Sequence, residues 1–168
     1  LLYGANLSSV SNKEAWYQKA SQLYPNDYRA YNNLGMLAYQ KGDMSAAENY
    51  FNKAKSLKAD APEVNANLAL IELGKGNVSA AETNLGKAAG AQGFNEASAA
   101  LNIAKGSYQQ AASAASGVKS NTAALAQILT KDYSKAAQTL NAVPNPDATT
   151  SYLKAIVAAR TNDANGVV

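Results

Sequence analysis

The chain has 168 residues, of which 47% are hydrophobic and 16% charged, so it can build one domain with a core or a short stack of repeats, and disorder by composition is excluded. It contains no Cys and no His, which excludes a disulfide framework, thiolate or Ser-His-Asp catalysis, and metal sites built on Cys or His ligands. The net charge of +3 is spread without a polybasic run and no apolar run approaches a membrane span, so we expect neither nucleic-acid binding nor direct membrane insertion.

The predicted elements form a repeat. The first element, at residues 15–26, matches residues 48–59 but has no complete first helix of its own before it. Two clear copies of the full pattern follow, because residues 31–48 align with residues 65–82 at an offset of 34 residues. A fixed period of this length is typical of stacked helical units, each of which buries its apolar face against its neighbours.

The helices of these two copies are predicted to be amphipathic. Apolar residues recur every three or four places, as at Leu34, Leu37 and Ala38, and this spacing places them on one face of a helix. The dipeptides Gly42-Asp43 and Gly76-Asn77 each supply a residue that ends one helix and a residue that caps the next. Each copy is therefore a helix, a turn and a second helix.

Small residues are expected where the two helices of a pair meet. Small side chains that face one another let two helix axes approach to about 8 to 10 Å or less. The larger side chains of Tyr17, Phe51 and Leu85 then fill the space to the following pair. The small residues on first helices are Gly35, Ala69, Ala99, Ala124 and Ala155, and those on second helices are Ala47, Ala81, Ala111 and Ala136.

Weaker copies follow at residues 106–111 and 131–136. Each has a turn, an aromatic residue two places later and a small residue three places beyond that. The spacing between turns shrinks from 34 residues to 30 and then 25 before it recovers to 31, which places a last turn near Asn162 that starts an incomplete helix. Because Ala, Ser and Gly dominate residues 97–126 and burying Ala gains little, we expect this segment to be the least stable.

The pattern resembles the tetratricopeptide repeat, a helix-turn-helix unit of 34 residues. Its signature positions are occupied by Leu34, Gly35, Ala47, Phe51 and Ala54. Residues 11–90 carry clear repeats, and residues 91–168 carry shorter, degenerate ones. The resemblance implies an all-α fold: a single domain over residues 1–168, built as a right-handed α-solenoid of about five antiparallel helix pairs, with incomplete repeats at both ends and no cofactor.

The resemblance also implies a ligand groove. In this family the first helix of each pair lines a concave channel through its second, fifth, ninth, twelfth and thirteenth positions. Those positions are Arg29, Asn32, Met36, Tyr39 and Gln40 in the clearest copy, and Glu63, Ala66, Leu70 and Leu73 in the next, with Glu96, Ile103, Leu125, Ile128 and Tyr152 continuing the line. The alternative is that Leu70, Leu73, Leu125 and Ile128 only complete packing between helices. Of the residues expected to grip a C-terminal carboxylate, only Arg29 and Asn32 resemble part of the clamp, which disfavours recognition of chaperone tails.

One catalytic pattern is present. Ser116 and Lys119 satisfy Ser-x-x-Lys, in which a Lys one helical turn on could deprotonate a Ser nucleophile. The companion elements of that chemistry are missing, and Gly117 sits where the helix should end, so chance explains the match better. The Gly- and Lys-bearing stretches 74–76 and 86–90 lack the spacing of a phosphate loop and are predicted to be turns and helix ends.

Three functions are consistent with these observations. The leading one is a non-enzymatic module that binds a peptide or a partner domain in its concave groove. The alternative is an architectural spacer or assembly segment of a larger polypeptide, whose groove holds part of its own chain. A hydrolase depends on Ser116 and Lys119 alone.

The composition and the stretch 121–129 look like tetratricopeptide regions attached to OmpA-family proteins of Bacteroidetes envelopes. That resemblance implies a periplasmic or cell-envelope location. The absence of Cys is equally common in cytoplasmic bacterial proteins.

The two ends are expected to expose apolar surface. Neither end offers a polar capping helix, so Leu1, Leu2, Tyr3 and Leu7 at one end and Tyr152, Ile156 and Val157 at the other should be uncovered. We therefore expect weak end-to-end self-association of this chain.

Overall fold

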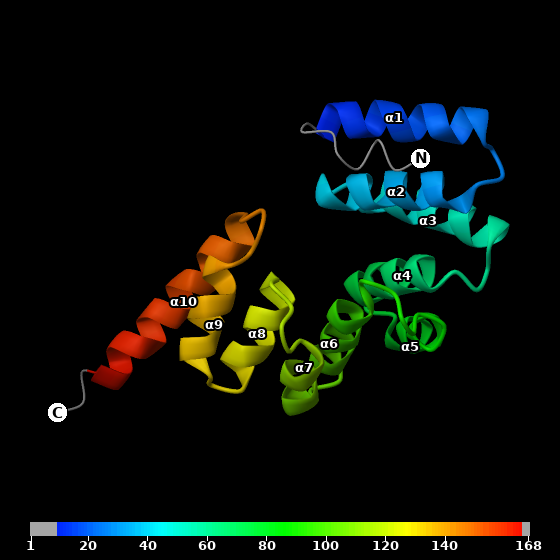
Figure 1. Cartoon of the computed structure of the whole chain (residues 1–168). Helices are drawn as coiled ribbons and strands as arrows, with labels where there is room; N and C mark the ends of the chain where they lie inside the picture. The colour runs from blue at the N-terminus through cyan, green and yellow to red at the C-terminus, as the bar shows by residue number, and fades with distance from the viewer. Residues whose placement is uncertain (1–9, 166–168) are drawn as a thin grey trace. The chain divides into compact units, whose positions relative to one another are not determined.

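The structure is a computed structural model that describes the backbone of residues 10–165 and the side chains of residues 12–162. Within those residues it has ten helices and no strand, which confirms the predicted all-α fold of about five helix pairs (Figure 1). The chain divides at Phe94 into two compact units, each of which is described by itself. The organisation of residues 1–168 as a single domain remains a prediction.

The first unit contains five helices, each of which packs against the next one along the chain. Contacts also join the first helices of successive pairs, α2 and α4. The helices are α1 (Val10–Leu23), α2 (Tyr28–Gln40), α3 (Met44–Leu57), α4 (Pro62–Gly74) and α5 (Val78–Leu85).

The described part of the second unit also contains five helices. Its contacts join α7 to α8, α8 to α9, and α10 to both α8 and α9. The helices are α6 (Phe94–Ala104), α7 (Tyr108–Ala114), α8 (Asn121–Leu129), α9 (Tyr133–Asn141) and α10 (Ala148–Asn165). Among the described helices, none carries the long apolar run that crossing a bilayer requires.

Four turns that join the helices of a pair share one backbone geometry. In the first, Gly42 has a left-handed φ of 81°, and the N–H of Asp43 donates to the carbonyl of Ala38 at 2.9 Å. The turns at Gly76 and Gly106 repeat this left-handed residue with φ of 79° and 74°. The fourth turn places Lys131 there with φ of 64°, although a side chain disfavours this conformation.

The predicted capping residues are confirmed at one turn and corrected at another. The Asp43 carboxylate accepts from the N–H of Ala46 at 3.0 Å and so caps α3. Asn77 stands before α5 but its side chain makes no capping bond. Its amide instead donates to Glu72 Oε2 at 2.7 Å, because that carboxylate lies beside the turn.

Two helices approach each other closely at Gly35 of α2 and Phe51 of α3. A Cβ atom at Gly35 would stand only 2.5 Å from Phe51 Cε1, so a hydrogen is the only substituent that fits. The Phe51 ring is 1% exposed and belongs to a core cluster with Val64 and Leu68 of α4. The ring therefore packs on the next pair, as predicted, and also against Gly35 of its own pair, where a small residue was expected.

The other small residues at helix crossings are buried, with one exception. Residues that are at most 1% exposed include Ala47, Ala69, Ala81, Ala99, Ala111, Ala124 and Ala136. Ala155 is exposed, so its predicted place at a crossing is wrong. The helical period puts it opposite Leu153 and Val157, which face the core of the second unit.

The end of the second unit differs from the prediction. Helix α10 runs without a break from Ala148 to Asn165, so the turn expected near Asn162 does not form. Val157 is 5% exposed instead of uncovered, because it packs in a cluster with Leu140 of α9, whereas Tyr152 is 67% exposed as predicted.

The exposed residues of α10 include Ser151, Lys154 and Ala158 together with the aromatic Tyr152. Ile156 is half-buried against the same cluster that holds Val157. The expectation that no polar helix caps this end remains a prediction. Leu1, Leu2, Tyr3 and Leu7 lie outside the described residues.

One cluster of the second unit contains no buried side chain larger than a methyl group. It joins Ala99 of α6 to Ala115 and Ala123, with Val118 half-buried against it. Such a cluster removes less apolar area from water than the Phe51 cluster of the first unit. The expected low stability of residues 97–126 remains a prediction that this composition supports.

The Gly35 contact predicts opposite effects for two Gly-to-Ala changes. Gly35→Ala forces the added methyl group against the Phe51 ring and should lower the free energy of unfolding by about 1 to 3 kcal/mol. Gly74→Ala, at a helical position with no atom within 4 Å of its added Cβ, should raise it by about 0.5 to 1 kcal/mol. Urea unfolding monitored by circular dichroism measures both. A Gly35→Ala variant as stable as the parent would contradict the close approach.

The left-handed Lys131 predicts that Gly is the better residue at this turn. Lys131→Gly should raise the melting temperature, with a gain of about 1 kcal/mol in unfolding free energy, because Gly adopts a φ of 64° without strain. Gly106→Lys should lower the unfolding free energy by a similar amount. An added Cβ there meets nothing within 4 Å, so the strain of a side chain at a φ of 74° is its only cost. Equal melting temperatures for all three proteins would show that the turn is not left-handed in solution.

Candidate functional site

The first unit has an open hollow of about 580 Å³ beside α2, α3 and α4, which we call the Tyr39 hollow. Ile71 is buried in its wall at 4% exposure, and Leu70 and Tyr39 are half-buried there. Met44, the first residue of α3, is 49% exposed. The lining residues are Tyr39, Met44, Ser45, Glu48, Leu70, Ile71, Gly74 and Lys75.

An ion pair stands at this hollow. Lys75 Nζ lies 2.8 Å from Glu48 Oε1 and 3.4 Å from Glu72 Oε1, and the hydrogen bond with Glu48 raises the pKa of Lys75. The pKa of Glu72 is lowered, first by the hydrogen bond from the Asn77 amide. The hollow is therefore apolar inside and has one positive and one negative charge at its edge.

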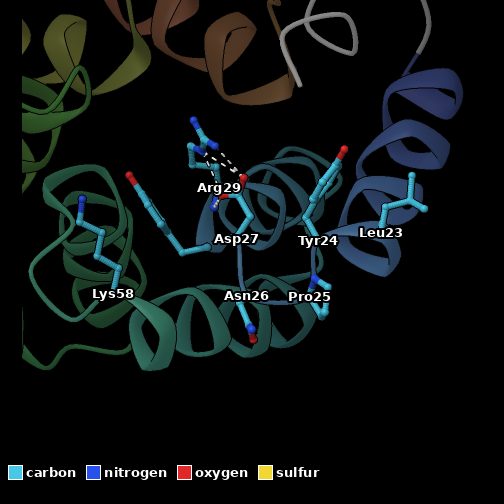
Figure 2. A pocket seen from close by; sticks show the side chains of 8 residues that line it. Leu23, Tyr24, Pro25, Asn26, Asp27, Arg29 and Lys58 are labelled. Carbon is cyan, nitrogen blue, oxygen red and sulfur yellow. Dashed lines mark hydrogen bonds and ion pairs between the residues drawn. The ribbon is translucent and has the colours of Figure 1, made fainter.

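A second hollow, of about 730 Å³, lies at the start of α2 (Figure 2). We call it the Asp27 hollow; it is lined by Leu23, Tyr24, Pro25, Asn26, Asp27, Tyr28, Arg29 and Lys58. The Asp27 carboxylate caps α2 and binds the Arg29 guanidinium, with Nη2 and Oδ2 2.7 Å apart and Nε and Oδ1 2.9 Å apart. The pKa of Asp27 is lowered mainly by this bond to Arg29. The positive charge of Arg29, which a bound carboxylate would need, is thus already neutralised.

Tyr28 connects α2 to α4. Its hydroxyl donates to Glu63 Oε1 at 2.6 Å, and this bond to a carboxylate raises the pKa of Tyr28 to about 12. Lys58 Nζ lies 5.2 Å from the centre of the Tyr28 ring, within reach of a cation–π attraction. A second link joins the same helices further along, where Asn67 Nδ2 donates to Asn32 Oδ1 at 2.9 Å.

The structure separates the residues predicted to line one groove. It brings Tyr39 and Leu70 together in the Tyr39 hollow and puts Arg29 in the Asp27 hollow. Asn32 and Ala66 are buried at 8% and 1% exposure, the first of them in the bond with Asn67. The remaining predicted groove residues line neither hollow. Met36 and Gln40 are exposed, and Glu63 and Leu73 are half-buried.

The residues that continue the predicted line fall in the second unit. Glu96 Oε2 accepts from the hydroxyl of Ser120 at 2.5 Å, a bond between α6 and the residue that caps α8. Leu125 and Ile128 are half-buried against the cluster of Leu140 and Val157, as the packing alternative expects. Ile103 is half-buried and Tyr152 is exposed.

Six of the eight lining residues of the Tyr39 hollow were not among the predicted site residues. Met44, Ser45 and Glu48 belong to the second helix α3, Ile71 and Gly74 to α4, and Lys75 to the following turn. One signal in the sequence could have indicated Glu48 and Lys75. The pair Glu48–Lys75 repeats the pair Glu14–Lys41 one period of 34 residues later, and the structure forms both ion pairs.

The pattern at Ser116 and Lys119 lies in a turn after α7, where both residues are exposed. Gly117 between them has a φ of 78°, so the two side chains are not one helical turn apart. The described residues also contain no cluster of Asp and Glu that could hold a metal ion.

Comparisons with known proteins agree with the repeat architecture. The sequence profile of the tetratricopeptide repeat matches residues 28–60, the segment that contains α2 and α3. The fold is similar to a chain in the crystal structure of the APC/C hetero-tetramer Cut9-Hcn1, with a TM-score of 0.60 and 18% sequence identity over 86% of this chain. The present chain spans 32% of the length of that chain. Among curated protein sequences, none matches this one.

The Tyr28–Glu63 bond predicts a stability loss that depends on pH. Tyr28→Phe should lower the free energy of unfolding by about 1 kcal/mol at neutral pH, because it removes the bond to Glu63. The pKa of Tyr28 is raised from 10.0 to about 12, so the contribution is complete below pH 10 and disappears as the pH rises to about 12. Urea unfolding of parent and variant across this range measures the difference.

Tyr24→Phe is the matched control, because Tyr24 lines the same hollow and is 57% exposed. It should leave stability unchanged. A Tyr28→Phe effect that persists undiminished at pH 12 would contradict the role of the hydroxyl.

Proposed function

We propose that the chain is a non-enzymatic protein-interaction module and that its first unit binds a peptide segment of a partner protein. The observation that carries this proposal is the apolar Tyr39 hollow, which is open to solvent between two repeats. A large apolar side chain of the partner inserts among Leu70, Met44 and Tyr39, and the partner backbone lies along the surface above them.

The side chains of the hollow suit this role. The side chain of Met44 is unbranched and polarisable, which lets it repack around partners of different shape. Tyr39 offers a rigid aromatic surface, a residue type that is enriched at binding hot spots. Burial of this apolar surface contributes about 25 cal/mol per Å² before the entropic cost of association is subtracted.

The charges at the edge supply specificity. Glu48 and Lys75 are partly exposed, so a partner with one acidic and one basic residue beside its apolar anchor can contact both. Exposed charge pairs of this kind steer and orient a partner more than they add affinity. Capture of a C-terminal carboxylate is not part of the proposal, because Arg29 is bound to Asp27 and Asn32 is bound to Asn67.

The alternative is an architectural segment of a larger cell-envelope polypeptide. It is favoured by large apolar side chains on α1 that lie outside both the core and the Tyr39 hollow. Trp16 is 52% exposed and Leu23 is 63% exposed, and both stand where another segment of a longer protein could pack.

A selection from a peptide library displayed on phage tests the interaction module. The full chain should enrich peptides that share a large apolar residue flanked by charged ones. Met44→Glu should weaken the selected peptides at least tenfold, a loss of about 1.4 kcal/mol, because it places a charge at the apolar hollow. The substitution should preserve the fold, since an acidic residue in the first turn of α3 is favourable.

Leu129→Glu is the control for a charge placed on an apolar surface, because Leu129 is 37% exposed in the other unit. Fluorescence polarisation with labelled peptides measures each affinity. Failure to enrich any peptide, or equal binding by parent and Met44→Glu, would favour the architectural alternative.

A further inference from the structure

A polar hollow of about 420 Å³ lies in the second unit, among α7, α8 and α9. Its lining includes Gln127 near the end of α8, Ser113 and Ser116 at the end of α7, and Asp132 and Lys135 at the start of α9. No aromatic side chain lines it. Two second helices contribute to this hollow, and it belongs to a different unit from the Tyr39 hollow.

Gln127 is the unusual member of this lining. Its side chain is 3% exposed, yet its Oε1 atom has no hydrogen-bond partner among the described residues. Buried amide oxygens in proteins are nearly always bonded, and one that lines a hollow points to a donor supplied from outside the chain.

Equivalent positions in the other repeats do not share this feature. The backbone carbonyl of Gln127 accepts a hydrogen bond from the N–H of the residue that precedes the second helix. The residues whose carbonyls do the same in the other repeats are Ala38, Glu72 and Asn102. Ala38 has no polar side chain, the Glu72 carboxylate accepts from Asn77, and the Asn102 amide donates to Ser98. The unpaired oxygen of Gln127 is therefore specific to this hollow and is not required by the repeat.

We propose that this hollow binds a primary carboxamide, the group at the tip of an Asn or Gln side chain. Its N–H donates to Gln127 Oε1, and its carbonyl accepts from the Ser113 or Ser116 hydroxyl or the Lys135 ammonium. A carboxamide also satisfies Gln127 in either orientation of the Gln127 amide, because it carries both a donor and an acceptor. A carboxylate has no N–H for this oxygen, and the absence of an aromatic ring gives a base nothing to stack on.

Other groups of the lining already have structural partners. Asp132 Oδ1 caps α9 by accepting from the N–H of Lys135 at 3.2 Å. The Thr130 hydroxyl donates within 3.1 Å to carbonyls of its own helix. These bonds keep the walls in place and leave Gln127 as the group that selects the ligand.

Titration followed by two-dimensional ¹H–¹⁵N NMR tests the proposal on the full chain. Propionamide should shift the side-chain amide of Gln127 and the backbone amides of Ser113 and Ser116 in a saturable manner, whereas propionate of the same shape should not. Two further arms distinguish the sources of the carboxamide. Free L-glutamine and the blocked peptide acetyl-Gly-Gln-Gly-amide are compared, and tighter binding of the peptide identifies a protein segment as the ligand.

Gln127→Met should weaken propionamide binding at least tenfold and keep the melting temperature, since it replaces an unbonded polar group by an apolar one of similar size. Gln138→Met is the matched control, because Gln138 is exposed on α9 and does not line the hollow. Ser113 is exposed, so Ser113→Leu fills the hollow from the solvent side. This variant should weaken propionamide binding without altering Gln127.

Three results would overturn the proposal. They are shifts that do not saturate, equal shifts with propionate, and unchanged binding in both Gln127→Met and Ser113→Leu. Each would mean that water alone occupies the hollow.

Discussion

The structure depends on how closely the two helices of a pair can approach. At Gly35 there is no room for a single carbon beside the Phe51 ring, and Ala47 and Ala81 are fully buried on the second helices of their pairs. Because α2 and α3 lie this close, the ring of Phe51 extends past its own pair and packs with Val64 of α4. Small residues inside a pair thus place a large residue between pairs. Packing of α4 on the pair α2–α3 depends on that contact.

Polar residues fix the alignment of neighbouring repeats. Tyr28 bonds to Glu63 and Asn67 bonds to Asn32, so α2 and α4 are joined at two heights along their length. In the second unit, Ser120 bonds to Glu96 and the Asn121 amide donates to Asp147. Apolar contacts between helices tolerate sliding, whereas a buried hydrogen bond is lost when either helix shifts, since its groups are then left unpaired. Polar side chains on first helices therefore serve alignment as well as binding.

The sequence predicts whatever depends on neighbouring residues and misses what depends on distant ones. The period, the helix pairs and the turns at Gly42 and Gly76 are readable because Gly marks a left-handed residue after a helix. Lys131 carries no such mark, and its left-handed conformation is visible only in the structure. Asn32 has a side chain that could bind a ligand. Only the structure shows that its Oδ1 instead accepts a hydrogen bond from Asn67 of the next repeat. Only Tyr39 and Leu70 of the Tyr39 hollow follow from the family pattern, because the other lining residues, such as Met44 of the second helix, are not at groove positions of that pattern.

The reach of the polar links has a consequence for how the chain folds. The side-chain bonds described between repeats join residues 24 to 35 apart, and the turns close over a few residues each. Low sequence separation of contacts means a small loss of loop entropy before each contact forms, which is the condition for fast folding. Each unit can consequently assemble while the rest of the chain is still being synthesised, and can open and close again without unfolding its neighbour.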